Sequence, residues 1–309
     1  MHYKIGPQAD RYITGVEGGY LLRPQGACDL ESTLCGGQAF RWKKIDGAYQ
    51  GVVFGRQLRL RQRQDGLFLE GAEDVRDAVL MARYLAADVD QDAIESRLAS
   101  YDDVMGRAVA ASSGLRTLRQ EPWETLIAFI ISANNGVANI SRVMDNLSEM
   151  YGDKAEGPLG SYSMFPGPDQ LVDAGHEGIW ACKAGFRTRG ICEAARGVLE
   201  GSIDLDCISS MDYPAAKEEL LKLHGIGEKV ADCILLFSMG KYEAFPVDVW
   251  IERIVRRLYF DDGKVSHKRI RQWADEAFGG LAGFANQFLF NYGRKFIAGQ
   301  LRKSPLAGN

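Results

Sequence analysis

The chain has 309 residues, 46% of them hydrophobic and 25% charged, with a formal net charge of −4. This is an ordinary soluble composition, and the length allows a sizeable core. No apolar run approaches the roughly 18–20 residues needed to cross a bilayer, and residues 1–15 lack the basic-then-apolar layout of a signal peptide. These features exclude a membrane partner and indicate a cytoplasmic protein.

The first part of the chain reads as β-structure. Short alternating runs at residues 47–55, 56–64 and 66–71 are separated by Gly55 and by an Asp65–Gly66 turn signal. This pattern is typical of an antiparallel meander. From about residue 72 the apolar spacing becomes three and four residues, which predicts helices beginning with residues 77–86 and 92–100.

Most of the remaining chain is predicted to be helical. Pro122 opens an apolar helix, and an amphipathic helix that starts near residue 136 stops at Gly152. The Gly- and Pro-rich residues 152–170 predict a long surface connection. Further helical runs cover residues 185–201, 212–223, 232–240, 246–260, 267–279 and 281–297. A sheet followed by helices implies an α+β fold.

The charge is unevenly distributed along the chain. Residues 250–309 hold 11 Lys and Arg against 5 Asp and Glu, which gives +6 there and −10 elsewhere. A polyanion such as nucleic acid could bind the basic C-terminal part, although a solvated helical surface has the same composition.

The cysteines predict neither a disulfide framework nor a metal centre. They contain no CxxC pair, whereas zinc and iron–sulfur sites need ligands at short spacing. We expect free buried thiols in a reducing compartment and no bound metal. The six are Cys28, Cys35, Cys182, Cys192, Cys207 and Cys233.

Residues 213–239 read as a helix, the turn "HGIG" and a second helix. Gly225 and Gly227 allow positive φ and expose backbone amides, which together with the helix start around Val230 form a site for a phosphate. An ordinary helix–turn–helix corner remains the alternative for the glycines alone.

The segment "LHGIGEKVA" at residues 223–231 resembles the helix–hairpin–helix of DNA repair glycosylases. In that superfamily a lysine at the position of Lys229 marks enzymes that combine glycosylase and lyase activity, and an aspartate follows at the position of Asp248. A nucleophilic amine must be neutral, and the positive end of a helix dipole disfavours its charge. Asp248 could shuttle protons and stabilise a cationic sugar, and it also suits the N-cap of the next helix.

Four further segments are similar to signatures of the 8-oxoguanine DNA glycosylase family. They are "STLCGGQAFRW", "FIISANNGVANI", "GFRTRG" and "GFANQFLFNYGR", at residues 32–42, 129–140, 185–190 and 283–294. The resemblance implies an N-terminal antiparallel β-sheet domain packed on an α-helical helix–hairpin–helix glycosylase domain. It implies domains at 1–115 and 116–309, the latter divided into 116–185 with the Asn-Asn motif and 186–309 with the hairpin, catalytic and basic helices.

The resemblance also implies a base pocket. The carbonyl of Gly37 would accept the hydrogen that N7 carries in 8-oxoguanine, whereas N7 of guanine is itself an acceptor. Phe290 and Cys233 would cover the two faces of the extruded base. Asn286 stands where family members commonly have glutamine, and it would bond to the Watson–Crick edge.

Other residues would contact the DNA around the flipped nucleotide. Asn134 and Asn135 match the Asn-Asn motif of the family, and the resemblance places Asn134 in the gap left by that nucleotide. It places Phe186 as a wedge in the stack and Arg187 at the opposite base. Asn139 occupies the position of an arginine that reads the opposite cytosine in eukaryotic members. We therefore predict weaker discrimination of the opposite base.

The predicted function is excision of 8-oxoguanine from duplex DNA by a monomer, followed by β-elimination at a Lys229 Schiff base, without a cofactor. One alternative is a helix–hairpin–helix glycosylase for other damaged bases, because the hairpin and its lysine do not specify the base. A non-catalytic DNA-binding scaffold is the other, and the pairing of Lys229 with Asp248 argues against it.

Overall fold

The N-terminal sheet forms where apolar and polar side chains alternate. Leu58 and Leu60 are fully buried and lie between arginine and glutamine residues of one strand, so their side chains point to the same face. The computed structural model describes residues 9–297, and its larger sheet has six antiparallel strands in the order β1-β2-β6-β5-β4-β3. The strands are β1 Ile13–Val16, β2 Gly19–Leu22, β3 Trp42–Ile45, β4 Ala48–Val53, β5 Arg56–Arg63 and β6 Gly66–Glu70.

The predicted meander is confirmed as β4, β5 and β6, while the pattern missed three strands. β1, β2 and β3 have four residues each, which is too short for an alternation to stand out. Pairing with longer neighbours stabilises them: Leu22 of β2 lies opposite Leu67 of β6, and Trp42 of β3 lies opposite Gly51 of β4.

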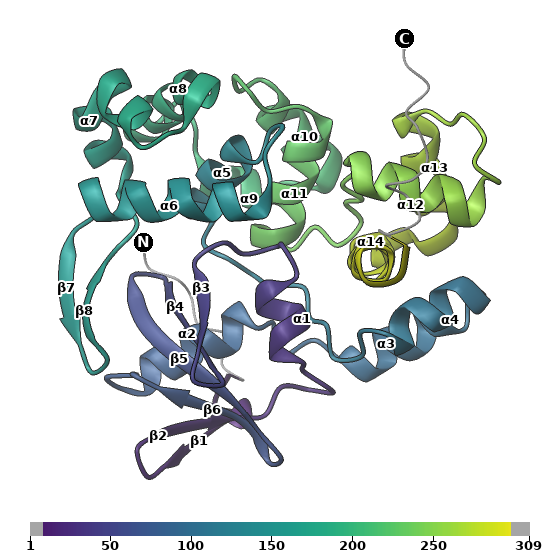
Figure 1. The fold of residues 1–309 in the computed structure, drawn as a ribbon, viewed down its shortest axis with the longest axis horizontal. Coiled ribbons are helices and arrows are strands. Elements are labelled where there is room, and N and C mark those ends of the chain that lie inside the picture. Colours follow the sequence, from purple (N-terminus) through teal and green to yellow (C-terminus); the bar gives the residue numbers. More distant parts are fainter. Residues whose placement is uncertain (1–8, 298–309) are drawn as a thin grey trace.

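The rest of the described chain is almost entirely helical, as predicted, and the α+β fold class is confirmed. Figure 1 shows α5, α6, α10 and α11 above the sheet, and α12, α13 and α14 to one side. The helices are α1 Leu30–Cys35, α2 Val75–Tyr84, α3 Gln91–Ala99, α4 Asp103–Ala110, α5 Pro122–Ile131, α6 Val137–Tyr151, α7 Pro168–Ala181, α8 Thr188–Leu199, α9 Leu205–Ser210, α10 Tyr213–Leu221, α11 Glu228–Ser238, α12 Val249–Tyr259, α13 His267–Phe278 and α14 Ala282–Tyr292. No helix within residues 9–297 is long and apolar enough to cross a membrane.

The prediction for residues 152–170 was wrong. This segment contains an antiparallel hairpin, β7 Lys154–Gly157 and β8 Gly160–Ser163, and the first turn of α7. Gly160 closes the hairpin at φ +100°, a conformation that favours glycine, and the hydroxyl of Tyr162 donates to the carbonyl of Gly55 at 3.1 Å. The glycines therefore mark a hairpin, and its strand β8 contacts the loop between β4 and β5.

Helices α3 and α4 do not share the core of the sheet. Leu98 and Met105 are buried in one cluster with Ile251 of α12 and Phe288 of α14. The sheet has its own cluster with α2, and α5 to α11 form another. The N-terminal part of the chain thus contributes directly to the core of the C-terminal helices. The boundary after residue 115 stays a prediction.

The cysteines are free, but not all are buried. Cys182 and Cys233 are buried, whereas Cys35 and Cys207 are exposed. The prediction of buried thiols was wrong for these two, because Cys35 ends α1 at the surface and Cys207 lies on the outer face of α9.

Candidate active site

The hairpin between α10 and α11 presents its backbone to solvent. Gly225 has φ +83°, which requires glycine, but Gly227 has φ −98° and is the N-cap of α11, so the prediction of positive φ there was wrong. A Cβ atom at either glycine would meet nothing within 4 Å. Ile226 between them is buried, and so is Val230, which offers only its backbone amide at the start of α11.

A cluster of ion pairs fixes α11 against its neighbours. The carboxylate of Asp232 is fully buried, and its Oδ1 accepts from Lys217 of α10 at 2.8 Å. Glu228 pairs with the same lysine at 2.7 Å and with Arg271 of α13 at 3.0 Å. Charges on three helices therefore hold the first turn of α11, where Lys229 lies.

Lys229 is half-buried, and its amine reaches the C-terminal end of α5. Its Nζ donates to Oγ of Ser132 at 3.0 Å and lies 5.3 Å from the centre of the Phe129 ring. The Ser132 hydroxyl donates to the carbonyl of Phe129 at 2.7 Å, so its lone pairs are left to accept from Lys229. The negative end of α5 thus opposes the unfavourable positive end of α11 at the amine.

Asp248 is the N-cap of α12, as the sequence predicted. Its Oδ1 accepts from the amide of Ile251 at 2.7 Å. This hydrogen bond fixes the carboxylate and leaves Oδ2 available to a ligand. Within residues 9–297 no ion pair joins Asp248 to Lys229, so each retains free hydrogen-bonding capacity toward the space between them.

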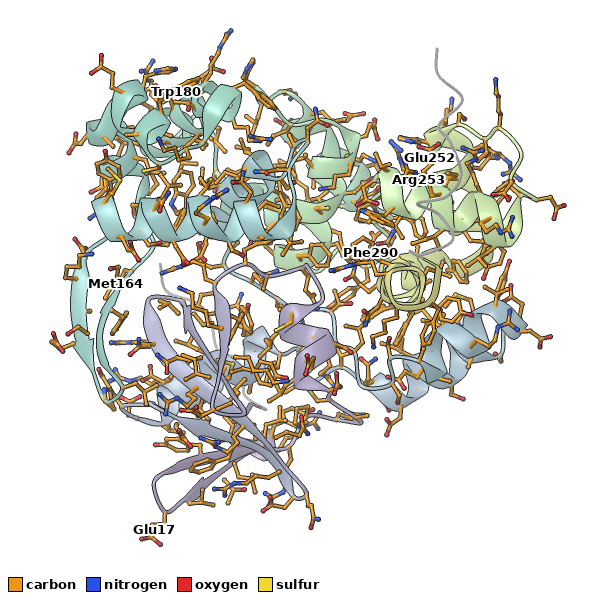
Figure 2. All side chains as sticks on the ribbon, in the orientation of Figure 1. Glu17, Met164, Trp180, Glu252, Arg253 and Phe290 are labelled. Atoms are coloured by element: carbon orange, nitrogen blue, oxygen red, sulfur yellow. The ribbon has the colours of Figure 1, made fainter. Side chains whose placement is uncertain are left out.

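Lys229 and Asp248 line one open pocket, whose empty space is about 400 Å³ when the part open to solvent is included. Its walls come from α5, α11, α12, α14 and the loop after α1, which lie far apart in the sequence. Figure 2 shows Phe290 on α14, near the middle of the molecule. The lining residues are Gly37, Phe129, Lys229, Cys233, Phe237, Pro246, Asp248, Ile251, Asn286, Gln287 and Phe290. The predicted catalytic and base-pocket residues therefore share one cavity.

The loop that carries Gly37 is anchored by the side chain of the next residue, Gln38. Gly37 has φ +99°, a conformation that favours glycine, and its Cα faces Phe290, since a Cβ atom there would make an ordinary contact of 3.7 Å with that ring. The side chain of Gln38 is almost fully buried and bonds to the carbonyls of Thr33 and Arg116 at 2.9 and 2.8 Å. The backbone of Gly37 is consequently anchored at the edge of the pocket.

Cys233 lies one helical turn beyond Lys229 and is 4% exposed. Burial raises the pKa of the Cys233 thiol to about 12, against the opposing effect of the Lys229 ammonium. The thiol is therefore neutral at physiological pH, which suits a polarisable wall for an aromatic ligand better than a nucleophile.

The predicted opposite-strand residues gather on a second site beside the pocket. Asn134 is exposed and has φ +50°, while the amide of Asn135 donates to the carbonyl of Ile131 at 3.1 Å. Asn139 donates to Oδ1 of Asn135 at 2.7 Å, and Arg142 donates to Asn139. Asn135 and Asn139 therefore shape the turn internally, and only Asn134 projects freely.

Phe186 and Arg187 complete this second site. The ring of Phe186 is 66% exposed, as an intercalating side chain requires. Arg187 lies over that ring at 4.3 Å and donates to the carbonyls of Ala133 at 2.8 Å and Asn134 at 3.0 Å. One guanidinium thus joins the ring of Phe186 to the loop of Asn134.

Part of the basic C-terminal charge is neutralised within the protein. Arg256, Arg257, Arg269 and Arg271 each form an ion pair with an acidic residue. The acidic partners of Arg256, Arg257 and Arg269 lie within residues 250–309 and are already subtracted in the net charge of +6. Of these four pairs, only that of Arg271 with Glu228 lowers the net positive charge available to a polyanion. Residues 302 and 303 lie outside the described residues.

Sequence reasoning missed three residues that contact this site: Phe129, Ser132 and Gln287. Phe129 and Ser132 lie within the segment "FIISANNGVANI", but nothing in that segment alone places them beside Lys229, 97 residues beyond Ser132. Gln287 directly follows Asn286, and a polar residue inside an apolar helix was the available signal.

Comparison with known proteins agrees with this geometry. The model of the 8-oxoguanine DNA glycosylase N-terminal domain matches residues 20–126, and that of the HhH-GPD superfamily of base excision DNA repair proteins matches residues 127–278. The 8-oxoguanine glycosylase/lyase of Clostridium acetobutylicum, solved with double-stranded DNA containing cytosine opposite 8-oxoguanine, is 34% identical with a TM-score of 0.87. That match covers 92% of this chain and 97% of the other.

Two sequence relatives point to the same activity. A probable N-glycosylase/DNA lyase of Methanothermobacter thermautotrophicus is 28% identical over 299 residues, covering 88% of this chain and 95% of the relative. The N-glycosylase/DNA lyase of Saccharomyces cerevisiae is 29% identical over 265 residues, covering 77% of this chain and 70% of the relative.

Proposed function

This chain belongs to the 8-oxoguanine DNA glycosylase family, and from that premise we infer that it excises 8-oxoguanine from duplex DNA and then cleaves the strand. The observation that carries this function is the pocket itself. Lys229 and Asp248 line the same cavity as Gly37 and Phe290, so a nucleophile and a base-binding site face each other.

Lys229 is the proposed nucleophile. Its neutral amine attacks C1′ of the flipped nucleotide, the bond from C1′ to N9 breaks, and the base leaves with the bonding electrons. Opening of the sugar ring then gives a Schiff base between Nζ and C1′. Loss of a proton from C2′ expels the 3′ phosphate, and water releases Lys229 from the cleaved strand.

Asp248 acts on charge and protons during these steps. Its fixed position at the N-cap of α12 supports a role in stabilising the positive charge that develops on the sugar. Oδ2 of Asp248, which accepts no hydrogen bond from a backbone amide, is free to take a proton from the attacking amine. Ser132 holds that amine at the end of α5, and this positions it for attack.

Recognition of the lesion rests on the hydrogen at N7 of 8-oxoguanine and on stacking against the ring of Phe290. The carbonyl of Gly37 accepts from N7–H of 8-oxoguanine and repels N7 of guanine, because two acceptors then face each other. Phe290 and Cys233 sandwich the base, supported by their places in the pocket. Asn286, which the resemblance places at the Watson–Crick edge, lines the pocket but already donates its amide to the carbonyl of Pro246.

The second site binds the DNA from which the base is taken. Asn134 fills the gap in the stack, Phe186 wedges between bases, and Arg187 lies at the opposite base. Asn139 provides no guanidinium, which supports weak discrimination of the opposite base. The amides around Gly225, Gly227 and Val230 bind a backbone phosphate.

The decisive experiment is borohydride trapping on duplexes that contain 8-oxoguanine opposite each of the four bases. We expect a covalent adduct with the wild-type protein, similar amounts for the four opposite bases, and no adduct with Lys229→Gln. Absence of an adduct, or its survival in Lys229→Gln, contradicts the mechanism and favours a non-catalytic scaffold. Equal trapping on duplexes with 8-oxoguanine and with unmodified guanine contradicts the substrate assignment.

A further inference from the structure

The amide of Asn286 is already occupied within the protein. The side chain is 2% exposed, and its Nδ2 donates to the carbonyl of Pro246 at 2.9 Å. A backbone carbonyl can only accept, so the side-chain nitrogen must face Pro246 and Oδ1 must point the other way. The short side chain cannot turn toward a base without abandoning this bond.

The oxygen of Asn286 fixes the orientation of its neighbour. Nε2 of Gln287 donates to Oδ1 of Asn286 at 3.3 Å. Because that oxygen requires a donor, the opposite end of the Gln287 amide must be the oxygen Oε1. A chain of hydrogen bonds therefore runs from the carbonyl of Pro246 through Asn286 to Gln287.

Oε1 of Gln287 is the free end of this chain. The residue is 8% exposed and lines the same pocket as Lys229 and Phe290. Within residues 9–297, Oε1 accepts no hydrogen bond, and it is not among the buried polar atoms closed off from solvent. The pocket thus presents an acceptor whose orientation the protein has fixed in advance.

We propose that Gln287 reads the Watson–Crick edge of the base, and that Asn286 is a positioning residue that aims it. The proposal rests on the function inferred above. Guanine and 8-oxoguanine carry donors at N1 and N2, which an amide oxygen can accept, whereas adenine carries an acceptor at N1. An oriented Oε1 therefore favours guanine-type lesions and disfavours adenine-type ones, independently of the carbonyl of Gly37.

Comparing excision of two lesions distinguishes the contribution of the Watson–Crick edge from that of the rest of the base. 8-Oxoguanine and 8-oxoadenine both carry N7–H and a C8 carbonyl, so the contact to Gly37 is equivalent for the two. Each lesion is placed opposite cytosine in the same duplex, and single-turnover excision is measured for the full-length protein. The two lesions also differ in pairing and as leaving groups, but these differences are the same for every variant, so a change in the rate ratio between variants reports on the edge contact.

The variants are Gln287→Ala and Gln287→Met, of which the second keeps most of the side-chain volume. We expect both to lower the 8-oxoguanine to 8-oxoadenine rate ratio at least tenfold. Gln272→Ala, on the exposed face of α13, is the matched control and should leave the ratio unchanged. Asn286→Ala should lower the ratio less, because the free acceptor remains but is no longer aimed.

Two outcomes would overturn the proposal. In one, the Gln287 variants slow both lesions equally, which is the result of a purely structural role. In the other, Asn286→Ala removes the selectivity while the Gln287 variants keep it. Trapping on a duplex with an abasic site needs Lys229 but no base, so it should persist in every Gln287 variant and shows that they fold. Loss of trapping in the wild-type protein would instead count against the proposed function.

Discussion

The hydroxyl of Ser132 is expected to contribute measurably to the reactivity of Lys229. It accepts a hydrogen bond from Nζ at 3.0 Å, and its own proton is donated to the carbonyl of Phe129. Ser132→Ala removes that acceptor and leaves the lysine side chain free to leave the pocket. Its removal should slow attack on C1′ without weakening the binding of DNA.

The magnitude follows from the contact. The attacking amine is neutral, and hydrogen bonds between neutral groups contribute about 0.5–1.5 kcal/mol; because Ser132 is buried we take about 1–1.5 kcal/mol for this one. At about 1.4 kcal/mol for each factor of ten, the loss corresponds to a rate roughly 5- to 12-fold lower.

The assay is the single-turnover rate of borohydride-trappable adduct on a duplex with 8-oxoguanine, measured with protein in excess. Ser148→Ala is a matched control, because Ser148 is also a buried serine whose hydroxyl donates to a backbone carbonyl, that of Met144 at 2.9 Å, but it lies away from Lys229. A trapping rate of Ser132→Ala within twofold of the Ser148→Ala rate would refute the reasoning.

Two further predictions concern the opposite-strand loop and the pocket thiol. Arg187→Ala should weaken binding of lesion-containing duplex at least fivefold in a gel-shift titration, because the loop of Asn134 loses its contact with Phe186. The control is Arg189→Ala, at an exposed arginine two residues away. Equal affinities of the two variants would contradict the role of Arg187 in binding DNA. Since burial raises the pKa of Cys233 to about 12, its thiol should resist iodoacetamide from pH 7 to about 10, while the exposed Cys207 is labelled, as followed by mass spectrometry. Labelling of Cys233 in the folded protein at a rate near that of Cys207 would show that the pocket opens to solvent.

Local pattern predicted much of the fold because the relevant forces act over a few residues. Alternating side chains gave β4 to β6, and Asp248 was recognisable as an N-cap because it precedes an apolar helical run. The prediction failed where a signal was ambiguous: the glycines of residues 152–170 serve a hairpin rather than a loop. Gly227 was likewise grouped with Gly225, although only one of them has positive φ.

The sequence by itself determined the chemistry of the reacting groups: a lysine at the start of a helix, a capping aspartate, and the order of segments that marks the family. Only the tertiary structure decided their surroundings. The tertiary structure places Ser132 within hydrogen-bond distance of Lys229 and places the buried amide of Asn286 against the carbonyl of Pro246. It also places Gln287 in the wall of the pocket. The physical reason is that residue type fixes which bonds a group can make, whereas long-range packing of α5, α11, α12 and α14 fixes which of those bonds are already used.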